Sequence, residues 1–99
     1  MKINKGVNIQ GIDFKLRPAL MYAEDIWKSH GQELVITAGM EGEHSASSLH
    51  YYGLALDLRT NYFSLDTARI VCLELANKLG RNFDVVLEKS HIHVEYDPK

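Results

Sequence analysis

Apolar residues recur at helical spacing in the first half of the chain. They are Ala19, Leu20, Ala23, Ile26 and Trp27. Pro18 suits the first turn of a helix, because its missing N–H needs no partner there. Gly31 is a stop signal, so the pattern predicts a helix over residues 18–30.

A second apolar stripe advances by three and four residues. Its members are Leu65, Ala68, Cys72, Leu75 and Leu79. Ser64 precedes the stripe as a candidate N-cap, and Gly80 follows it as a terminator. The pattern predicts a helix over residues 65–79, in which Cys72 is an inert thiol buried in the core.

The remaining apolar segments are short and rich in β-branched residues, which is typical of strands. Residues 33–38 predict a strand buried on both faces or nearly so, and residues 54–58 predict a second strand. Residues 83–88 and 91–96 predict two further strands joined as a hairpin. Residues 1–15 alternate only weakly and predict an extended or irregular segment. Because strands and helices are mixed rather than strictly alternating, the predicted class is α+β, with two helices and a small, mainly antiparallel sheet.

The expected hairpin places polar side chains on one face of the sheet. With a two-residue loop, Glu88 stands opposite His91. Val86 then stands opposite His93, and directly opposed side chains project from the same face. Because side chains alternate along a strand, His91, His93 and Glu95 share that face. A β-bulge with a shifted register is the alternative, since the Lys-Ser loop is a poor type I′ turn.

Length and composition restrict the class of protein. A chain of 99 residues fits one domain spanning residues 1–99. The net charge of -2 and the lack of a basic run argue against nucleic-acid binding. No apolar run reaches the roughly 18 residues of a membrane span, and the polar first residues do not resemble a secretory leader. Cys72 is the single cysteine, which excludes an intrachain disulfide.

A motif that could carry chemistry lies between the two predicted helices. Its pattern, Ser-x-His-x-x-Gly-x-Ala-x-Asp, comprises Ser48, His50, Gly53, Ala55 and Asp57. Gly53 permits a sharp return of the chain, which would bring His50 and Asp57 together. The small Ala55 would let another element pack closely against the strand.

This motif and the hairpin together offer ligands for one zinc ion. Zinc in hydrolases typically takes three imidazole or carboxylate ligands and leaves a fourth position for water. His50 and Asp57 supply two ligands, and the pair His91 and His93 supplies the third. Either feature alone is more often a solvated surface pair. Their combination in a chain with only five histidines favours a zinc site.

The two motifs together resemble the zinc D-alanyl-D-alanine carboxypeptidase family. That family includes D-alanyl-D-alanine dipeptidases and the L-alanyl-D-glutamate endopeptidases of phage endolysins. The signalling domain of the hedgehog type is similar to it in fold and zinc site. The resemblance covers residues 33–96 and implies a hedgehog/DD-peptidase-like fold, with zinc bound by His50, Asp57 and His93.

The resemblance also implies roles for neighbouring residues. His91 would stabilise the oxyanion of the tetrahedral intermediate, and Ser48 would orient a zinc ligand. Many members carry a carboxylate, the general base, three positions before the last zinc ligand; that position here is Ser90. Glu88 is the nearest substitute, and we expect it to be the base.

The expected function is therefore zinc-dependent cleavage of peptide bonds in bacterial peptidoglycan, of the D,D-carboxypeptidase or L-Ala-D-Glu endopeptidase type. The expected partner is the peptidoglycan stem peptide. The alternative is a catalytically inactive zinc-binding module of phage origin, with a structural or binding role. It is suggested by Ser90 and by the lack of an arginine in the loop after residue 37. We expect a monomer, made in the cytoplasm without a signal peptide and acting at the cell wall after phage-assisted release.

Overall fold

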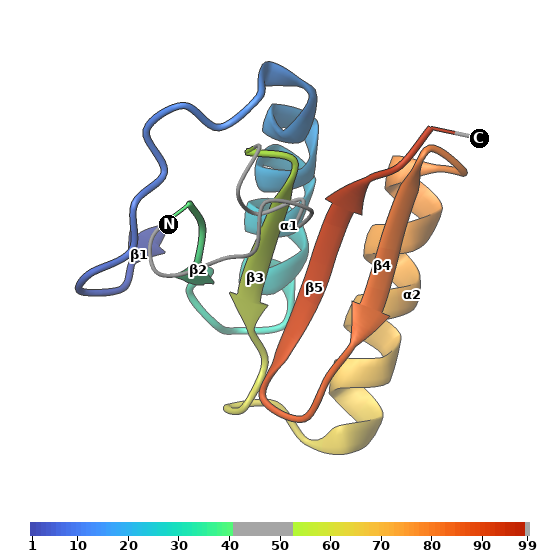
Figure 1. The fold of residues 1–99 in the computed structure, drawn as a ribbon. Coiled ribbons are helices and arrows are strands. Elements are labelled where there is room, and N and C mark those ends of the chain that lie inside the picture. The colour runs from blue at the N-terminus through green and yellow to red at the C-terminus, as the bar shows by residue number, and fades with distance from the viewer. Residues whose placement is uncertain (41–52, 99) are drawn as a thin grey trace.

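The structure, a computed structural model, describes residues 1–40 and 53–98. Its elements in chain order are β1 (Lys2–Ile3), a 3-10 turn (Phe14–Leu16), α1 (Arg17–Ser29), β2 (Val35–Ala38), β3 (Ala55–Arg59), α2 (Leu65–Leu79), β4 (Phe83–Leu87) and β5 (His91–Tyr96). Within the described ranges, the strands form a five-stranded sheet of order β1-β2-β3-β5-β4. β1 pairs with β2 in parallel, and the other pairings are antiparallel. The predicted α+β class, with two helices and a mainly antiparallel sheet, is confirmed (Figure 1).

The capping residues account for the ends of both helices. α1 starts one residue earlier than predicted and carries Pro18 in its first turn. At the start of α2, the Ser64 hydroxyl accepts a hydrogen bond of 3.1 Å from the Thr67 N–H. Gly80 ends α2 with a φ of 80°, where a side chain would be strained. Within the described ranges, neither helix is long and apolar enough to cross a membrane.

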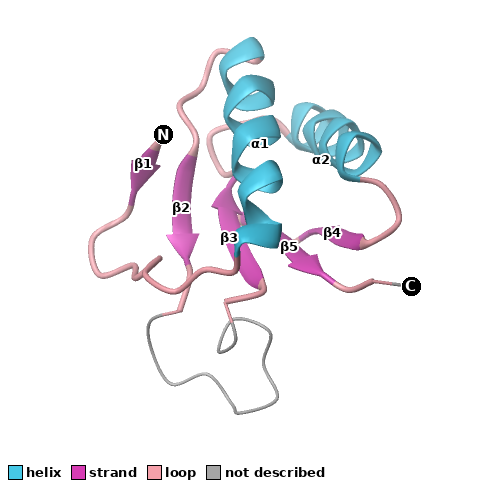
Figure 2. Cartoon of the chain, turned by 90° about the horizontal axis from the view of Figure 1, so that it is seen from above, coloured by secondary structure: helices cyan, strands magenta, loops and turns pink. Residues whose placement is uncertain are grey.

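Both helices pack against the same face of the sheet (Figure 2). The buried residues between them are Leu16, Ala19, Ala23, Ile26, Trp27, Leu34, Ile36, Leu56, Leu58, Val71, Leu75, Ile92 and Val94. Trp27 is fully buried, and its indole N–H donates a 2.8 Å hydrogen bond to the carbonyl of Arg59. This bond ties α1 to the end of β3, one of the two strands that carry the candidate site.

Cys72 packs against this core but remains partly exposed. Burial raises the pKa of its thiol. The sulfur lies 3.8 Å from the carbonyl oxygen of Val85 on β4. The thiol therefore lies at the edge of the core rather than at its centre.

The hairpin of β4 and β5 has the predicted register. Val86 pairs with His93, and the Glu88 N–H donates a 2.8 Å hydrogen bond to the carbonyl of His91. The pairing runs without a shift along the whole of β4, so the loop needs no bulge.

The central strands β3 and β5 divide their side chains between the two faces of the sheet. Leu56, Leu58, Ile92 and Val94 are buried with the helices. Since side chains alternate along a strand, the residues between them project from the opposite face. That face, which the two helices leave uncovered, receives the polar residues of both strands.

Candidate metal centre

Asp57 and His93 meet on the sheet face opposite the helices. They are 36 positions apart in the sequence but stand directly opposite each other on β3 and β5. Nδ1 of His93 lies 2.9 Å from Oδ1 of Asp57. Their side chains are only 22% and 17% exposed, so the contact is largely shielded from water. The fold thus brings together two of the three residues predicted to bind zinc.

His91 lies on the same face, two residues before His93. Its Nε2 atom is 3.6 Å from Oδ2 of Asp57, whereas Nδ1 of His93 bonds to Oδ1. Its Nδ1 atom is 3.2 Å from the hydroxyl of Ser90. A hydroxyl can donate to Nδ1, which leaves the ring proton on Nε2, facing Asp57.

Glu95 also contacts His93, although the sequence predicted no role for it. Its Oε1 atom lies 2.8 Å from Nε2 of His93. The alternation of β5 placed Glu95 on the correct face, and the spacing His-x-Glu on a strand is the signal that indicates the contact. Whether the two side chains meet depends on the rotation of the imidazole ring, which alternation does not determine.

The two carboxylates change the protonation of His93. Its pKa is raised, mainly by the hydrogen bond to Asp57 and further by the one to Glu95, while burial acts in the opposite direction. Ionised carboxylates only accept hydrogen bonds, so the ring carries a proton on each nitrogen when it contacts both. Without a metal, His93 therefore keeps its positive charge to a higher pH than an ordinary histidine.

The start of β3 is held against the N-terminal segment at Gly53. Its φ is 73°, and a Cβ atom there would lie 2.6 Å from the carbonyl oxygen of Gly11. The Asp13 N–H donates a 3.0 Å hydrogen bond to the Gly53 carbonyl. Both the conformation and the close approach require glycine, and together they fix the direction in which the chain enters the strand of Asp57.

Two of the three predicted zinc ligands, Asp57 and His93, lie side by side among the described residues. Imidazole nitrogen and carboxylate oxygen are donors that zinc prefers, and two such atoms bound at about 2.0–2.2 Å in a tetrahedron lie roughly 3.3 Å apart. The separation of 2.9 Å between His93 and Asp57, the two predicted ligands among the described residues, is close to this value. The third predicted ligand, His50, and the predicted orienting residue, Ser48, lie outside the described residues.

Glu88, the predicted base, lies at the rim of the hairpin with an exposed side chain. It lines a cavity of about 200 Å³ together with Thr60, Asn61 and Lys89. Asp57, His91, His93 and Glu95 form one group of contacting side chains, the Asp57 cluster. Among the described residues, no hydrogen bond or ion pair joins the Glu88 carboxylate to this cluster. The backbone register predicted for Glu88 is correct, while its role as a base stays a prediction.

A second group of acidic residues adjoins the cluster. Oxygens of Asp84, Glu95 and Asp97 lie within 4.8 Å of one another, an arrangement that could hold a metal ion. An all-oxygen set suits hard cations such as Ca²⁺ better than zinc. Glu95 belongs to both groups, and its contact with His93 links them.

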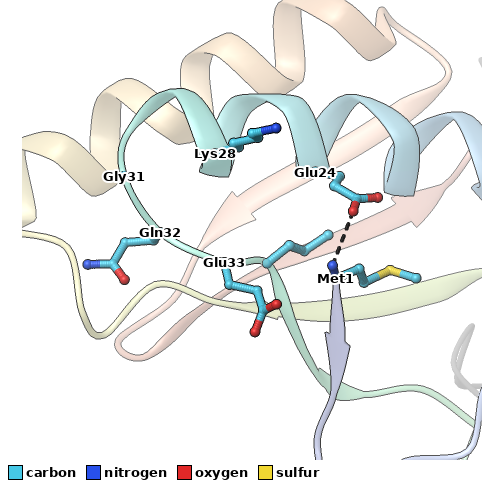
Figure 3. A pocket seen from close by; sticks show the side chains of 7 residues that line it. Met1, Glu24, Lys28, Gly31, Gln32 and Glu33 are labelled. Carbon is cyan, nitrogen blue, oxygen red and sulfur yellow. Dashed lines mark hydrogen bonds and ion pairs between the residues drawn. The ribbon is translucent and has the colours of Figure 1, made fainter.

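A larger cavity, of about 340 Å³, lies away from this chemistry (Figure 3). It is lined by Met1, Glu24, Lys28, Gly31, Gln32, Glu33 and Leu34. The terminal ammonium of Met1 forms a 3.1 Å ion pair with Glu24 at its edge. The cavity shares no residue with the Asp57 cluster and has no imidazole in its lining, so its size does not make it the candidate site.

No family model and no curated protein matches this chain. The case for a zinc site therefore rests on the two motifs and on the contacts among Asp57, His91, His93 and Glu95. The contacts of Asp57 with His91 and His93 are set by the pairing of β3 with β5, whereas the contact of His93 with Glu95 lies within β5.

Proposed function

We propose that this chain is a zinc-dependent peptidase that cleaves peptide bonds of bacterial cell-wall peptidoglycan. The observation that carries the proposal is the contact of 2.9 Å between the imidazole of His93 and the carboxylate of Asp57 on adjacent strands. The substrate class comes from the resemblance of the two motifs to D,D-carboxypeptidases and L-Ala-D-Glu endopeptidases. A hedgehog/DD-peptidase-like fold is part of the same proposal.

In this proposal, His50, Asp57 and His93 hold the metal. Zinc, when bound, supplies a water molecule of lowered pKa and polarises the carbonyl group of the scissile bond. Asp57 contributes a negative charge that is largely shielded from water, which strengthens its attraction for a cation. Ser48 orients one of these ligands.

His91 would stabilise the negative charge that develops on the substrate carbonyl. The Ser90 hydroxyl next to Nδ1 favours the ring form with its proton on Nε2, the nitrogen nearer to Asp57. That N–H can donate to an oxyanion formed beside the metal ligands. Ser90, at the position where many members of the family carry the base, would thus orient the imidazole of His91.

Glu88 would accept the proton of the attacking water. It stands opposite His91 in the hairpin, and its exposed carboxylate can move, since its side chain lies at the rim of the strand pair. A general base has to come within hydrogen-bond reach of the water, and such contacts are often longer before substrate binds.

The test is digestion of purified peptidoglycan by the zinc-loaded protein, with mass spectrometry of the released stem peptides. We expect new amino or carboxyl termini with the wild-type protein and none after His50→Ala, which also loses zinc. A wild-type protein that binds one zinc per chain yet releases no new termini from any peptidoglycan would refute the peptidase function.

The second candidate function is a zinc-binding module without catalysis. Ser90 at the expected position of the base, and the separation of Glu88 from the described cluster, favour it. Two variants discriminate between the candidates. If Glu88→Gln removes an existing peptidase activity, Glu88 is the base; if Ser90→Asp creates activity in an inactive protein, the native site lacks only that group.

The proposal also extends to the surroundings of the enzyme. The substrate would be the stem peptide, the protein would act as a monomer, and it would reach the wall after phage-assisted release from the cytoplasm. Sedimentation of the purified protein tests the monomeric state, with a mass of 11.2 kDa expected for one chain.

A further inference from the structure

We propose that Glu95 is a positioning residue that holds the His93 ring so that Nδ1, and not Nε2, is the atom presented to the metal. The inference rests on the proposed zinc site and deepens it. Its basis is the pair of contacts made by one imidazole: Nε2 to Glu95 at 2.8 Å and Nδ1 to Asp57 at 2.9 Å.

The direction of the hydrogen bond selects the metal-binding nitrogen. An ionised carboxylate only accepts, so the bond to Glu95 places a proton on Nε2 of His93. Without a metal, the bond to Asp57 places a proton on Nδ1 as well, so a metal has to displace one of the two protons. Asp57 is itself a proposed metal ligand and Glu95 is not, so the bond from Nε2–H to Glu95 persists and Nδ1 is the atom that binds the metal. Nδ1 is the nitrogen beside Asp57, the second proposed ligand. Histidines that bind metals commonly donate their other N–H to a carboxylate in this way.

The strand holds Glu95 where this bond can form. Glu95 and His93 are two residues apart on β5, so their side chains project from the same face. β5 pairs with β3 on one side and β4 on the other, which fixes the backbone below both residues. Their side chains are 25% and 22% exposed, so water competes only in part for the contact.

The neighbouring acidic residues offer a competing role for Glu95. Asp84 and Asp97 bring carboxylate oxygens to within 4.8 Å of one another and of Glu95, and Glu95 could serve with them as a ligand for a hard cation. The two roles differ in their dependence on the neighbours. Positioning of His93 requires Glu95 alone, whereas a cation site requires the three carboxylates together.

Zinc affinity of the full chain measures the effect, by competition with a chromophoric chelator at fixed pH. Glu95→Ala removes the acceptor and should weaken zinc binding by about 10–100-fold, the usual effect of losing such a partner. Glu95→Gln keeps an oxygen acceptor for Nε2–H and should recover most of that loss. Asp84→Asn is the matched control, because it removes a neighbouring carboxylate and leaves the contact with His93; its zinc affinity should stay close to wild type.

A spectroscopic measurement separates positioning from general damage to the fold. In the zinc-loaded protein labelled with ¹⁵N-histidine, His93 should show a metal-bound Nδ1 and a slowly exchanging proton on Nε2. Glu95→Ala should lose the slow exchange of that proton while keeping its circular dichroism spectrum and a cooperative thermal transition.

The outcomes are distinct for the two proposals. If wild type binds zinc but Glu95→Ala binds it equally well, or if the metal lies on Nε2, the role of Glu95 is refuted and the zinc site stands. If Asp84→Asn weakens zinc binding as much as Glu95→Ala, Glu95 acts in the carboxylate group instead. If wild type does not bind zinc, both the proposed function and this inference fail.

Discussion

At the scale of single residues, Asp57 is the centre of the candidate site. One of its oxygens contacts Nδ1 of His93 at 2.9 Å, and the other lies 3.6 Å from Nε2 of His91. Its charge compensates whichever cation occupies the site, a protonated imidazole or a metal ion. Replacing it by an isosteric neutral side chain therefore separates charge from shape.

Asp57→Asn should bind zinc more weakly than wild type by more than about 100-fold, beyond the range for the loss of an outer partner, because a charged ligand is removed. Chelator competition measures the affinity. Asp66→Asn is the control: this carboxylate on α2 has a side chain that is 93% exposed and forms only a 3.8 Å surface pair with Arg69. Equal zinc affinities for Asp57→Asn and wild type would remove Asp57 from the ligand set.

Cys72, unlike Asp57, has a structural role, because it packs against the core. Because burial raises the pKa of its thiol, less of the reactive thiolate exists in the folded protein than in the unfolded chain. We expect alkylation by iodoacetamide near pH 8 to be markedly slower in buffer than in denaturing urea, as followed by intact mass. Folding favours the protonated thiol, which therefore contributes to the free energy of unfolding. This contribution is fully present below the pKa of the unfolded thiol and is lost as the pH rises through the higher folded pKa. Equal alkylation rates in the two conditions would show an accessible, reactive thiol.

Only some of the contacts within the site could be predicted from the sequence. Asp57 and His93 could be predicted as partners because the motifs name them and the alternation of the strands orients them. The hydrogen bond from His93 to Glu95 could not, since it depends on a ring rotation that is set by packing on a finished sheet. The position of the Glu88 carboxylate depends on a flexible side chain at a strand end and has the same difficulty.

At the scale of elements, the pairing of β3 with β5 creates the site. A slip of one residue would turn Asp57 or His93 toward the helices, because strand side chains alternate. Leu58 and Ile92, which oppose each other in this pairing, are almost fully buried on the helix side. The apolar side of the pair therefore fixes the register of the polar side.

Ile92→Ala should lower the free energy of unfolding by about 2–5 kcal/mol, through lost burial and the cavity that remains. The matched control is Val86→Ala on the neighbouring strand β4. Val86 is 46% exposed, projects from the opposite face and should change stability by no more than about 0.5 kcal/mol. Urea denaturation of the metal-free proteins measures both values. Similar values for the two variants would contradict the assignment of the two faces.

The helices and the hairpin could be predicted to within about a residue because their signals are local: apolar spacing, caps and a two-residue loop. The place of β5 between β3 and β4 could not, because it joins segments more than 30 residues apart through tertiary packing. The parallel strand β1 has two residues, Lys2 and Ile3, too short a run to show periodicity.

At the scale of the whole molecule, the sheet separates an apolar core from a polar face. One face lies under α1 and α2 and buries the core (Figure 2). The other face carries Asp57, His91, His93 and Glu95. A metal that binds only the folded chain adds its binding free energy to the stability of the entire domain. Zinc should therefore raise the melting temperature, and a chelator should reverse the change.

The size of this zinc effect should depend on pH, because zinc and a proton compete for Nδ1 of His93. The pKa of His93 is raised, first by the hydrogen bond to Asp57 and then by Glu95, so the proton is held above the ordinary value of 6.5. In the metal-free protein this proton stabilises the fold: the contribution is complete below the unfolded pKa and disappears as the pH rises through the folded one. Zinc binding must release this proton. The apparent zinc affinity should therefore fall by about tenfold for each pH unit below the pKa of His93, for each proton displaced.

The zinc-induced rise in melting temperature should thus be small near pH 5 and grow toward pH 8, the range of about 5 to 8 in which histidine titrates. Thermal melts with zinc and with chelator at each pH measure the rise, and calorimetry in buffers of different ionisation enthalpy counts the protons released. His93→Gln is the matched variant: it keeps a polar side chain on β5, cannot carry the competing proton and should show a weaker zinc effect with a shallower dependence on pH. A zinc effect that is constant from pH 5 to 8 in the wild type would mean that His93 is not a ligand. Zinc binding through His93 has to depend on pH, because the proton on its ring must leave first.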